Sequence, residues 1–135
     1  MNTTFEQLIP WLEKAYALKS ALILFEWDNE TEAPQEASEQ TAKAIELLST
    51  AYYEAIINPD VKKLLKQLAK EKDLSVKEAA IVKDIQKQYD SMEPIPPKEY
   101  EAYQGLTARA SSIWARAKKA DDYSLFAPTL KEIIE

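Results

Sequence analysis

Residues 21–34 read Ala21-Leu22-Ile23-Leu24-Phe25-Glu26-Trp27-Asp28-Asn29-Glu30-Thr31-Glu32-Ala33-Pro34, an apolar run that passes into an acidic segment and stops at a proline. The run completes a helical pattern that starts near the amino terminus. Apolar residues recur there every three or four positions, at Phe5, Leu8, Leu12, Ala15, Leu18, Leu22 and Phe25. This spacing predicts a helix from about Thr4 to Trp27. Thr3 and Glu6 have the spacing of a capping box, and Pro10 either kinks the helix or restarts it.

Five more helical segments follow, each bounded by a recognisable signal. Asn58-Pro59-Asp60 and Ser75-Val76-Lys77-Glu78 have the residue order of helix starts, and Pro94–Pro97 is an extended break. The predicted helices span about 37–57, 59–70, 76–92, 98–120 and a last segment after Asp121-Asp122. On the second of the six helices we expect the inward residues to be Ala44, Leu47, Leu48, Ala51, Ala55 and Ile56. On the fifth we expect Tyr103, Leu106, Ala110, Ile113 and Ala117.

The composition fits one helical domain. The chain has 135 residues, of which 46% are hydrophobic and 30% charged, the balance of a globular protein. It has a single glycine, Gly105, whereas sandwiches and barrels need glycine in their many turns. We therefore predict an all-α fold of about six helices in an antiparallel, bundle-like array, with residues 1–135 forming a single domain or a fragment of a larger helical fold.

Net charge and apolar run length argue against several partners. The formal net charge is −6, which disfavours nucleic acid and anionic membrane surfaces as partners. The longest apolar run, Ala21–Phe25, is far shorter than the ~20 residues that span a bilayer. The chain has no cysteine and no basic flank of a signal peptide at its start, so we expect a cytoplasmic protein.

The residue types present also limit the chemistry. The chain has no histidine and no cysteine, which excludes a Ser-His-Asp triad, thiolate catalysis and the usual zinc ligands. Carboxylates, lysine, tyrosine or an oxygen-ligated metal are what remain. Arg109 and Arg116 lie seven positions apart on one predicted helix face and could bind a carboxylate, although structural pairing with acids is the commoner role.

The acidic segment after the apolar run is the strongest candidate patch. No Lys or Arg occurs between Lys19 and Lys43, and Glu26, Glu30 and Glu32 fall within this interval. These carboxylates would form a cation site or a patch that orients a charged substrate, or simply a solvated segment leading into a helix. Trp27 is expected to bury its ring and to need a partner for its indole N–H. Asp28 could accept that bond or bond backbone donors in the following turn, so that the pair fixes a corner between two antiparallel helices.

Several landmarks, taken in order, resemble the amino-terminal region of carboxypeptidase Taq-type zinc metallocarboxypeptidases. Trp27-Asp28 with Thr31 and Pro34 is similar to that family's Trp-Asp-x-x-Thr-x-x-Pro segment. Leu47-Leu48, the run Tyr89–Pro97, and Trp114-Ala115-Arg116-Ala117 before Asp122–Leu130 follow in the family's order. The resemblance marks six residues as the family's structural pattern: Trp27, Asp28, Thr31, Pro34, Trp114 and Arg116. A departure occurs at Gln40-Thr41, where the family commonly has a basic residue.

The resemblance implies a non-catalytic role for this chain. The family's zinc site, a His-Glu-x-x-His helix with a further glutamate, lies downstream of such a region, so no catalytic or metal residue can be assigned here. The implied role is a wall or lid of the substrate groove that also supports a homodimer, with zinc or another divalent metal and the peptide substrate bound by the rest of the parent enzyme. The last segment ends in mid-pattern on Glu135, which also favours a fragment. The alternative is a freestanding helical interaction module without catalysis.

Overall fold

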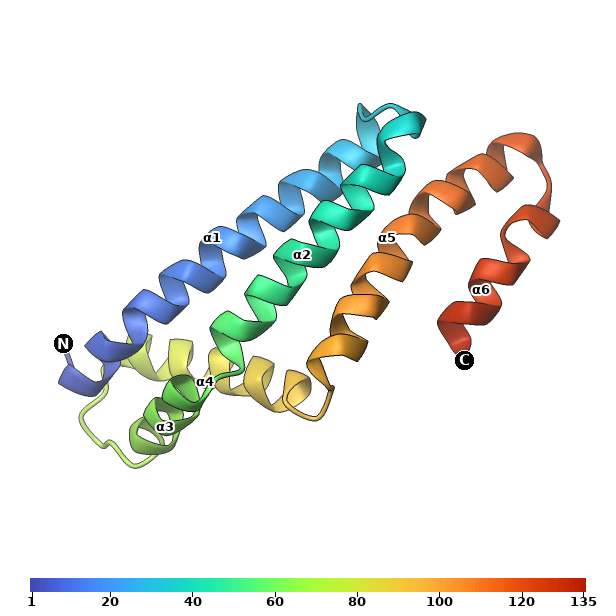
Figure 1. The fold of residues 1–135 in the computed structure, drawn as a ribbon. Coiled ribbons are helices and arrows are strands. Elements are labelled where there is room, and N and C mark those ends of the chain that lie inside the picture. The colour runs from blue at the N-terminus through green and yellow to red at the C-terminus, as the bar shows by residue number, and fades with distance from the viewer. The chain divides into compact units, whose positions relative to one another are not determined.

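The computed structural model describes residues 1–135 and contains helices but no strand, which confirms the prediction of an all-α fold with six helices. The helices are α1 (Thr3–Thr31), η1 (Gln35–Ala37), α2 (Ser38–Ile56), α3 (Pro59–Leu68), α4 (Val76–Met92), α5 (Pro97–Ala120), η2 (Tyr123–Leu125) and α6 (Ala127–Ile134), as labelled in Figure 1. No helix has the length and apolar character that crossing a membrane requires.

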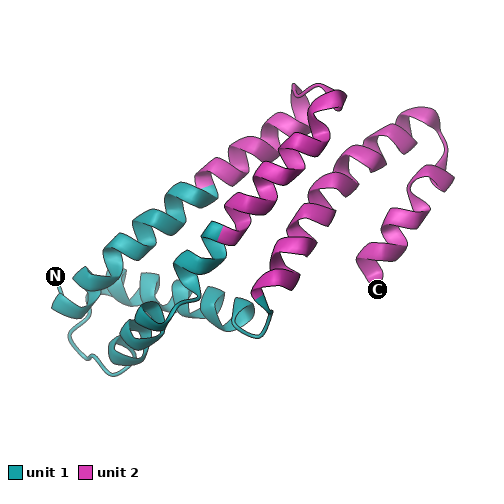
Figure 2. Ribbon diagram, in the orientation of Figure 1, with its two compact units in different colours: residues 1–19, 51–96 teal, residues 20–50, 97–135 magenta.

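The chain divides into two compact units, coloured separately in Figure 2. Unit 1 comprises Met1–Lys19 and Ala51–Pro96, and unit 2 comprises Ser20–Thr50 and Pro97–Glu135. The boundary falls inside α1 and inside α2, so each of these helices contributes residues to both units. Acidic and basic residues balance in unit 1, and the whole net charge of −6 therefore lies in unit 2.

Unit 1 has a core of large apolar side chains. Four apolar residues of α3 are buried there: Val61, Leu64, Leu65 and Leu68. The other large buried side chains of the unit are Phe5, Leu8, Tyr53, Ile56, Val82, Ile85, Tyr89 and Met92. Burying each such side chain stabilises the fold by roughly 1.5–3 kcal/mol, so unit 1 contains the main hydrophobic core of the chain.

Two predicted helix starts in unit 1 are confirmed. The Asn58 side chain accepts a hydrogen bond from the Val61 backbone N–H at 3.0 Å, and Pro59 occupies the first turn of α3. Ser75 and Glu78 form the capping box of α4: the Glu78 N–H donates to the Ser75 hydroxyl oxygen at 3.3 Å, and the Ser75 N–H donates to Oε2 of Glu78 at 2.8 Å. Both caps satisfy backbone donors that have no partner inside the helix.

The predicted Thr3 cap of α1 is wrong. Asn2 takes this role, because its side-chain oxygen accepts from the N–H groups of Thr4 at 2.9 Å and Phe5 at 3.1 Å. The Asn2 N–H also donates to Oε1 of Glu78 at 3.0 Å, which ties the start of α1 to the start of α4. The helix then continues through Pro10 without interruption, although a proline cannot donate a backbone hydrogen bond to the preceding turn.

The predicted end of α1 at Trp27 is also wrong, because the helix runs to Thr31. The Thr31 hydroxyl donates to the Trp27 carbonyl at 2.7 Å, and the N–H groups of Glu32 and Ala33 donate to the Asp28 carbonyl at 3.0 and 2.8 Å. These bonds complete another turn, so the chain reverses only beyond Thr31. Trp27 therefore does not form a buried corner: it sits within the helix, and 70% of its surface is exposed.

The inward face of α2 is only partly the predicted one, since Ala55 and Ile56 are buried as expected. Ala42, Ile45 and Ser49 are buried and lie three or four residues apart, whereas the expected core residue Leu47 is 56% exposed. The prediction followed the most apolar positions and therefore missed a face built partly from small residues. On α5, Ala110 and Ala117 are buried as predicted, and Tyr103 is exposed.

The last segment of unit 2 begins near the predicted Asp121-Asp122 pair. Asp121 has φ of 52°, a left-handed conformation that reverses the chain after α5 and that Asp tolerates better than most residues. The Asp122 side chain then accepts from the Ser124 N–H at 3.0 Å and caps η2, while α6 starts with Ala127 and Pro128 in its first turn. The two aspartates thus form the turn between α5 and the final helices.

Candidate functional site

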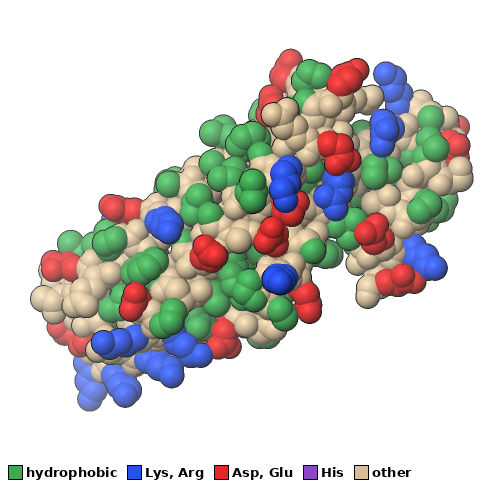
Figure 3. Space-filling view, in the orientation of Figure 1, with side chains coloured by type: hydrophobic (Ala, Val, Ile, Leu, Met, Phe, Trp, Pro, Cys, Tyr) green, Lys and Arg blue, Asp and Glu red, His purple; other side chains and the backbone are tan.

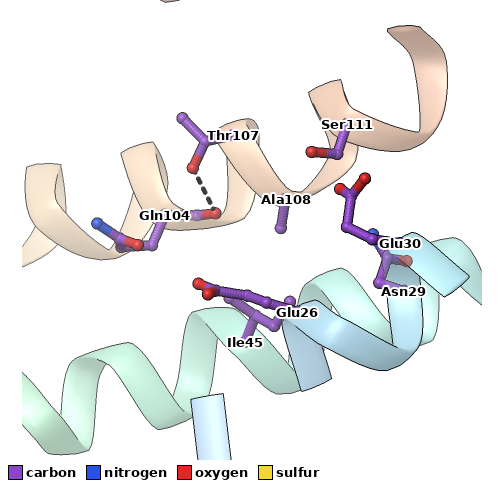
Figure 4. Close-up of a pocket in the computed structure, with 8 residues that line it drawn as sticks. All are labelled: Glu26, Asn29, Glu30, Ile45, Gln104, Thr107, Ala108 and Ser111. Atoms are coloured by element: carbon purple, nitrogen blue, oxygen red, sulfur yellow. Dashed lines mark hydrogen bonds between the residues drawn. The ribbon is translucent and has the colours of Figure 1, made fainter. Parts of the chain in front are cut away.

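A polar cavity of about 310 Å³ lies within unit 2. Its lining residues come from three helices and are shown in Figure 4: Glu26, Asn29, Glu30, Ile45, Gln104, Thr107, Ala108 and Ser111. Except for Ile45 and Ala108, these side chains are polar. The cavity therefore offers hydrogen-bonding groups and negative charge, in contrast to the apolar core of unit 1.

Helical spacing accounts for the way these residues meet. Asn29 and Glu30 lie three and four positions after Glu26 on α1 and share one face of that helix with it. On α5, Gln104, Thr107 and Ser111 follow one another at intervals of three and four positions and also share a face. In Figure 4 the two glutamates extend from α1 toward this stripe of α5. Two polar helix faces thus enclose the cavity.

The hydroxyl of Thr107 is already engaged within its own helix. It lies 3.1 Å from the Gln104 carbonyl, the bond drawn in Figure 4, and 3.0 Å from the Tyr103 carbonyl. Its hydrogen is thus directed to the backbone, so Thr107 can offer a ligand only acceptor capacity. The amide of Gln104 and the hydroxyl of Ser111 are the donors that the α5 stripe provides.

The donor set does not fit a metal ion. No group of three or more His, Cys, Asp or Glu residues is arranged to hold one. Glu26 and Glu30 bring two carboxylates to the cavity, whereas the hard cations usually bound by proteins take six or more oxygen ligands in a closed shell. The cavity can instead receive a hydrated or organic cation, or a polar segment of a peptide.

Glu46 forms a second charged arrangement in unit 2. Its Oε1 atom lies 2.8 Å from Nζ of Lys43, and its Oε2 atom lies 3.0 Å from the point where a β-carbon on Gly105 would stand. The hydrogen bond from Lys43 lowers the pKa of Glu46 most, burial opposes this shift, and the charge of Arg109 adds to the lowering. Glu46 is thus an ionised carboxylate set against the only glycine of the chain.

The predicted site residues are only partly brought together. Glu26 and Glu30 line the cavity, whereas Glu32 lies beyond the end of α1 and is exposed. Pro34 precedes η1, where its carbonyl accepts from the Ala37 N–H at 2.9 Å. Asp28 engages the chain turn through its backbone carbonyl, as described above, and not through its side chain.

The remaining pattern residues lie on α5 and do not line the cavity. Trp114 lines a shallow apolar groove together with Phe126 and Ile133, and Nζ of Lys118 stands 4.9 Å from the centre of its ring. That geometry is a cation–π contact. Arg116 is exposed and makes no ion pair.

Sequence reasoning missed the α5 side of the cavity. Gln104, Thr107 and Ser111 were not recognised as candidates, although their spacing is a readable signal: a polar stripe on a helix whose buried face is apolar. The role of Gly105 was missed as well, because only the close approach of Glu46 from α2 reveals it.

Comparison with known proteins identifies what the chain is similar to. A family model described as carboxypeptidase Taq (M32) metallopeptidase matches residues 7–135. Carboxypeptidase 1 of Bacillus subtilis (strain 168) is 32% identical over 136 residues, an alignment covering 100% of this chain and 27% of that protein. Thermostable carboxypeptidase 1 of Pyrococcus furiosus is 26% identical over 133 residues and is also covered to 27%.

Solved structures give the same result. The BsuCP crystal structure matches with a TM-score of 0.92 and 31% identity, covering 97% of this chain and 27% of that one. The structure of Pyrococcus furiosus carboxypeptidase in its apo-Mg form matches with a TM-score of 0.76 and 26% identity, covering 99% and 27%. The chain thus spans about a quarter of the length of the relatives it matches.

Proposed function

The chain belongs to the carboxypeptidase Taq (M32) metallopeptidase family, and we propose that it serves as the amino-terminal, non-catalytic portion of a metal-dependent carboxypeptidase that removes residues from the carboxyl ends of peptides. Two findings together carry this proposal. The family model matches residues 7–135, and the chain covers only 27% of the length of each relative. The relatives are matched in their amino-terminal part.

The catalytic metal of such an enzyme would be bound outside these 135 residues. The family description implies a metal, yet this chain has no histidine and no cluster of three potential ligands. Its residues do not fit a zinc or other divalent metal centre, and no step of peptide hydrolysis is assigned to them. We propose that residues 1–135 act on the reaction only by shaping the space that the substrate enters.

The polar cavity of unit 2 supports a role in the substrate groove. Glu26 and Glu30 give it negative charge, and Gln104 and Ser111 give it hydrogen-bond donors suited to a peptide backbone. We propose that this face of α1 and α5 forms part of the wall or lid of the groove. Carboxylates at such a place would favour substrates with basic residues and repel acidic ones.

We also propose that this portion supports a homodimer of the parent enzyme. The support is a group of exposed large apolar residues on the last third of the chain: Trp114, Tyr123, Leu125 and Ile134. Exposed apolar area of this kind marks interaction surfaces in soluble proteins. Sedimentation of the parent enzyme before and after Leu125→Gln and Ile134→Gln tests this part of the proposal, which predicts a shift from dimer to monomer.

A chimeric polypeptide tests the main proposal. The segment of Bacillus subtilis carboxypeptidase 1 that matches this chain is replaced by residues 1–135, and release of carboxyl-terminal residues from peptides is measured with and without a metal chelator. We expect chelator-sensitive activity well above that of the same polypeptide lacking the segment. A folded chimera that is no more active than the truncated polypeptide would contradict the proposal, as would chelator-sensitive activity of the 135-residue chain alone.

A further inference from the structure

A row of large apolar side chains is exposed on the second half of α1. The exposed fractions are 53% for Ile23, 69% for Leu24, 39% for Phe25 and 70% for Trp27. Ile23, Leu24 and Trp27 lie on one side of the helix, because residues one and four positions apart from Ile23 fall within about 100° of it. We call these three residues the Trp27 face. Figure 3 shows hydrophobic side chains gathered along this part of α1.

Unit 2 buries small residues and leaves its large ones exposed. Its buried apolar residues are Ala42, Ile45, Ala110 and Ala117, of which only Ile45 is large. The large apolar residues that it exposes are Ile23, Leu24, Phe25, Trp27, Leu47, Tyr103, Trp114, Tyr123, Leu125 and Ile134. In unit 1 the reverse holds, since twelve large apolar residues there are buried and four are exposed. The exposed residues of unit 2 are therefore not the ordinary scatter of a protein surface.

The surroundings of the Trp27 face are acidic. Between Lys19 and Lys43 the chain carries Glu26, Asp28, Glu30, Glu32, Glu36 and Glu39 and no basic residue. A partner that covers the face therefore needs an apolar centre and a rim of Lys or Arg. A second copy of this chain fits poorly, because symmetric pairing through the Trp27 face would bring two acidic rims together.

We propose that the Trp27 face is the contact surface for the remaining part of the parent M32 polypeptide, which would present an apolar patch edged by basic side chains. This inference rests on the proposed function. It is supported by the match of α1 and its neighbours to carboxypeptidases about four times longer than this chain, with a TM-score of 0.92 for the BsuCP crystal structure.

The test compares one double variant in two settings. Leu24→Gln with Trp27→Gln is made in the 135-residue chain and in the chimera with Bacillus subtilis carboxypeptidase 1. In the chain alone both side chains are largely exposed, so the melting temperature stays unchanged and binding of a hydrophobic dye falls. In the chimera the same change lowers the melting temperature by several degrees. Val76→Gln, which removes a 90% exposed apolar residue at the start of α4 in unit 1, is the matched control and leaves both melting temperatures unchanged.

Three results would overturn the inference. Equal destabilisation of chain and chimera would mean that Leu24 and Trp27 stabilise unit 2 itself. An unchanged chimera would mean that the remaining polypeptide does not cover the face. A chain that sediments as a dimer, and as a monomer after the double substitution, would assign the face to a second copy. An unsubstituted chimera that folds but is inactive refutes the proposed function, whereas these three results bear on the Trp27 face alone.

Discussion

The carboxylate of Glu46 lies directly against Gly105, with Oε2 only 3.0 Å from the position of a β-carbon on that glycine. Nη1 of Arg109 lies 3.3 Å from the same position. Both neighbours are the far ends of flexible side chains, and neither is backbone. The close approach of α2 to α5 at this point therefore depends on the absence of a side chain at Gly105. A β-carbon there would require the Glu46 and Arg109 side-chain ends to move by only a few tenths of an ångström.

Gly105→Ala is expected to be neutral or to stabilise the protein by up to about 1 kcal/mol, since alanine is favoured over glycine inside a helix by about that amount. The Glu46 and Arg109 side-chain ends can move aside at small cost. Gly105→Leu is the contrasting variant and should destabilise the fold by about 1–3 kcal/mol through overpacking. Urea unfolding of the three proteins measures the difference. Destabilisation by alanine as large as that by leucine would show that Glu46 is held rigidly.

Glu78 predicts a specific pH dependence. Its pKa is lowered from 4.5 to about 2, first by hydrogen bonding with the Ser75 side chain and then by the backbone N–H groups of Ser75 and Asn2. The folded state thus releases this proton more readily than the unfolded state. The resulting stabilisation is complete above about pH 4.5 and is lost as the pH falls toward 2.

Glu78→Gln should therefore lower the melting temperature at pH 7. Between pH 4.5 and pH 2 the melting temperature of this variant should fall less than that of the wild type. Glutamine can no longer accept both backbone N–H bonds, and it does not titrate. Thermal unfolding followed by circular dichroism across this range gives both quantities. Glu71→Gln is the control, at an exposed acid whose side chain accepts a single hydrogen bond, from the Thr4 hydroxyl at 3.3 Å. Parallel wild-type and Glu78→Gln curves would refute the assignment.

The inward face of α2 can be checked with two substitutions. Ile45 is 3% exposed and Leu47 is 56% exposed. Ile45→Ala should cost about 2–5 kcal/mol because it removes buried methyl groups and leaves a cavity. Leu47→Ala should change stability by no more than about 0.5 kcal/mol. Chemical denaturation of both variants decides between this face and the one expected from the apolar pattern, for which the two costs would be reversed.

The cap of α3 gives a fourth prediction. Asn58→Ala removes the acceptor of the Val61 N–H and should cost about 1 kcal/mol, within the usual range of about 0.5–2 kcal/mol for a lost cap. Asn29→Ala, in the last turn of α1 where the Asn29 side chain makes no hydrogen bond, is the control and should cost nothing. If both variants unfolded at the same denaturant concentration, the Asn58 hydrogen bond would not stabilise the helix.

Local signals in the sequence predicted most of the helices and some of the packing. Asn58 and the Ser75–Glu78 pair set helix starts through bonds between near neighbours, and Pro97 does so through its fixed backbone angle. Signals of both kinds can be read from the local sequence. Trp27 could not be placed correctly in this way. The apolar character of Trp27 predicted that its ring is buried. Burial also requires another segment to pack against that side of α1, and none of the 135 residues does so.

The candidate site was half predictable for the same reason. Glu26 and Glu30 stand out in the sequence because no basic residue is near them. The residues that face them on α5, Gln104 and Ser111, are more than seventy positions away in the sequence. A polar residue on a helix does not reveal which other helix it faces. That pairing follows from the packing of α1 against α5 in unit 2, which no local sequence pattern specifies.

The bond between the Asn2 N–H and Glu78 has a consequence for the order of folding. It joins residues 76 positions apart, so the first helix cannot complete its amino-terminal contacts until the fourth helix has begun. During synthesis at about 5–20 residues per second, Asn2 waits roughly 4–15 s for Glu78 to be made. The amino-terminal turn of the first helix therefore gains this long-range contact only after the start of the fourth helix has been synthesised.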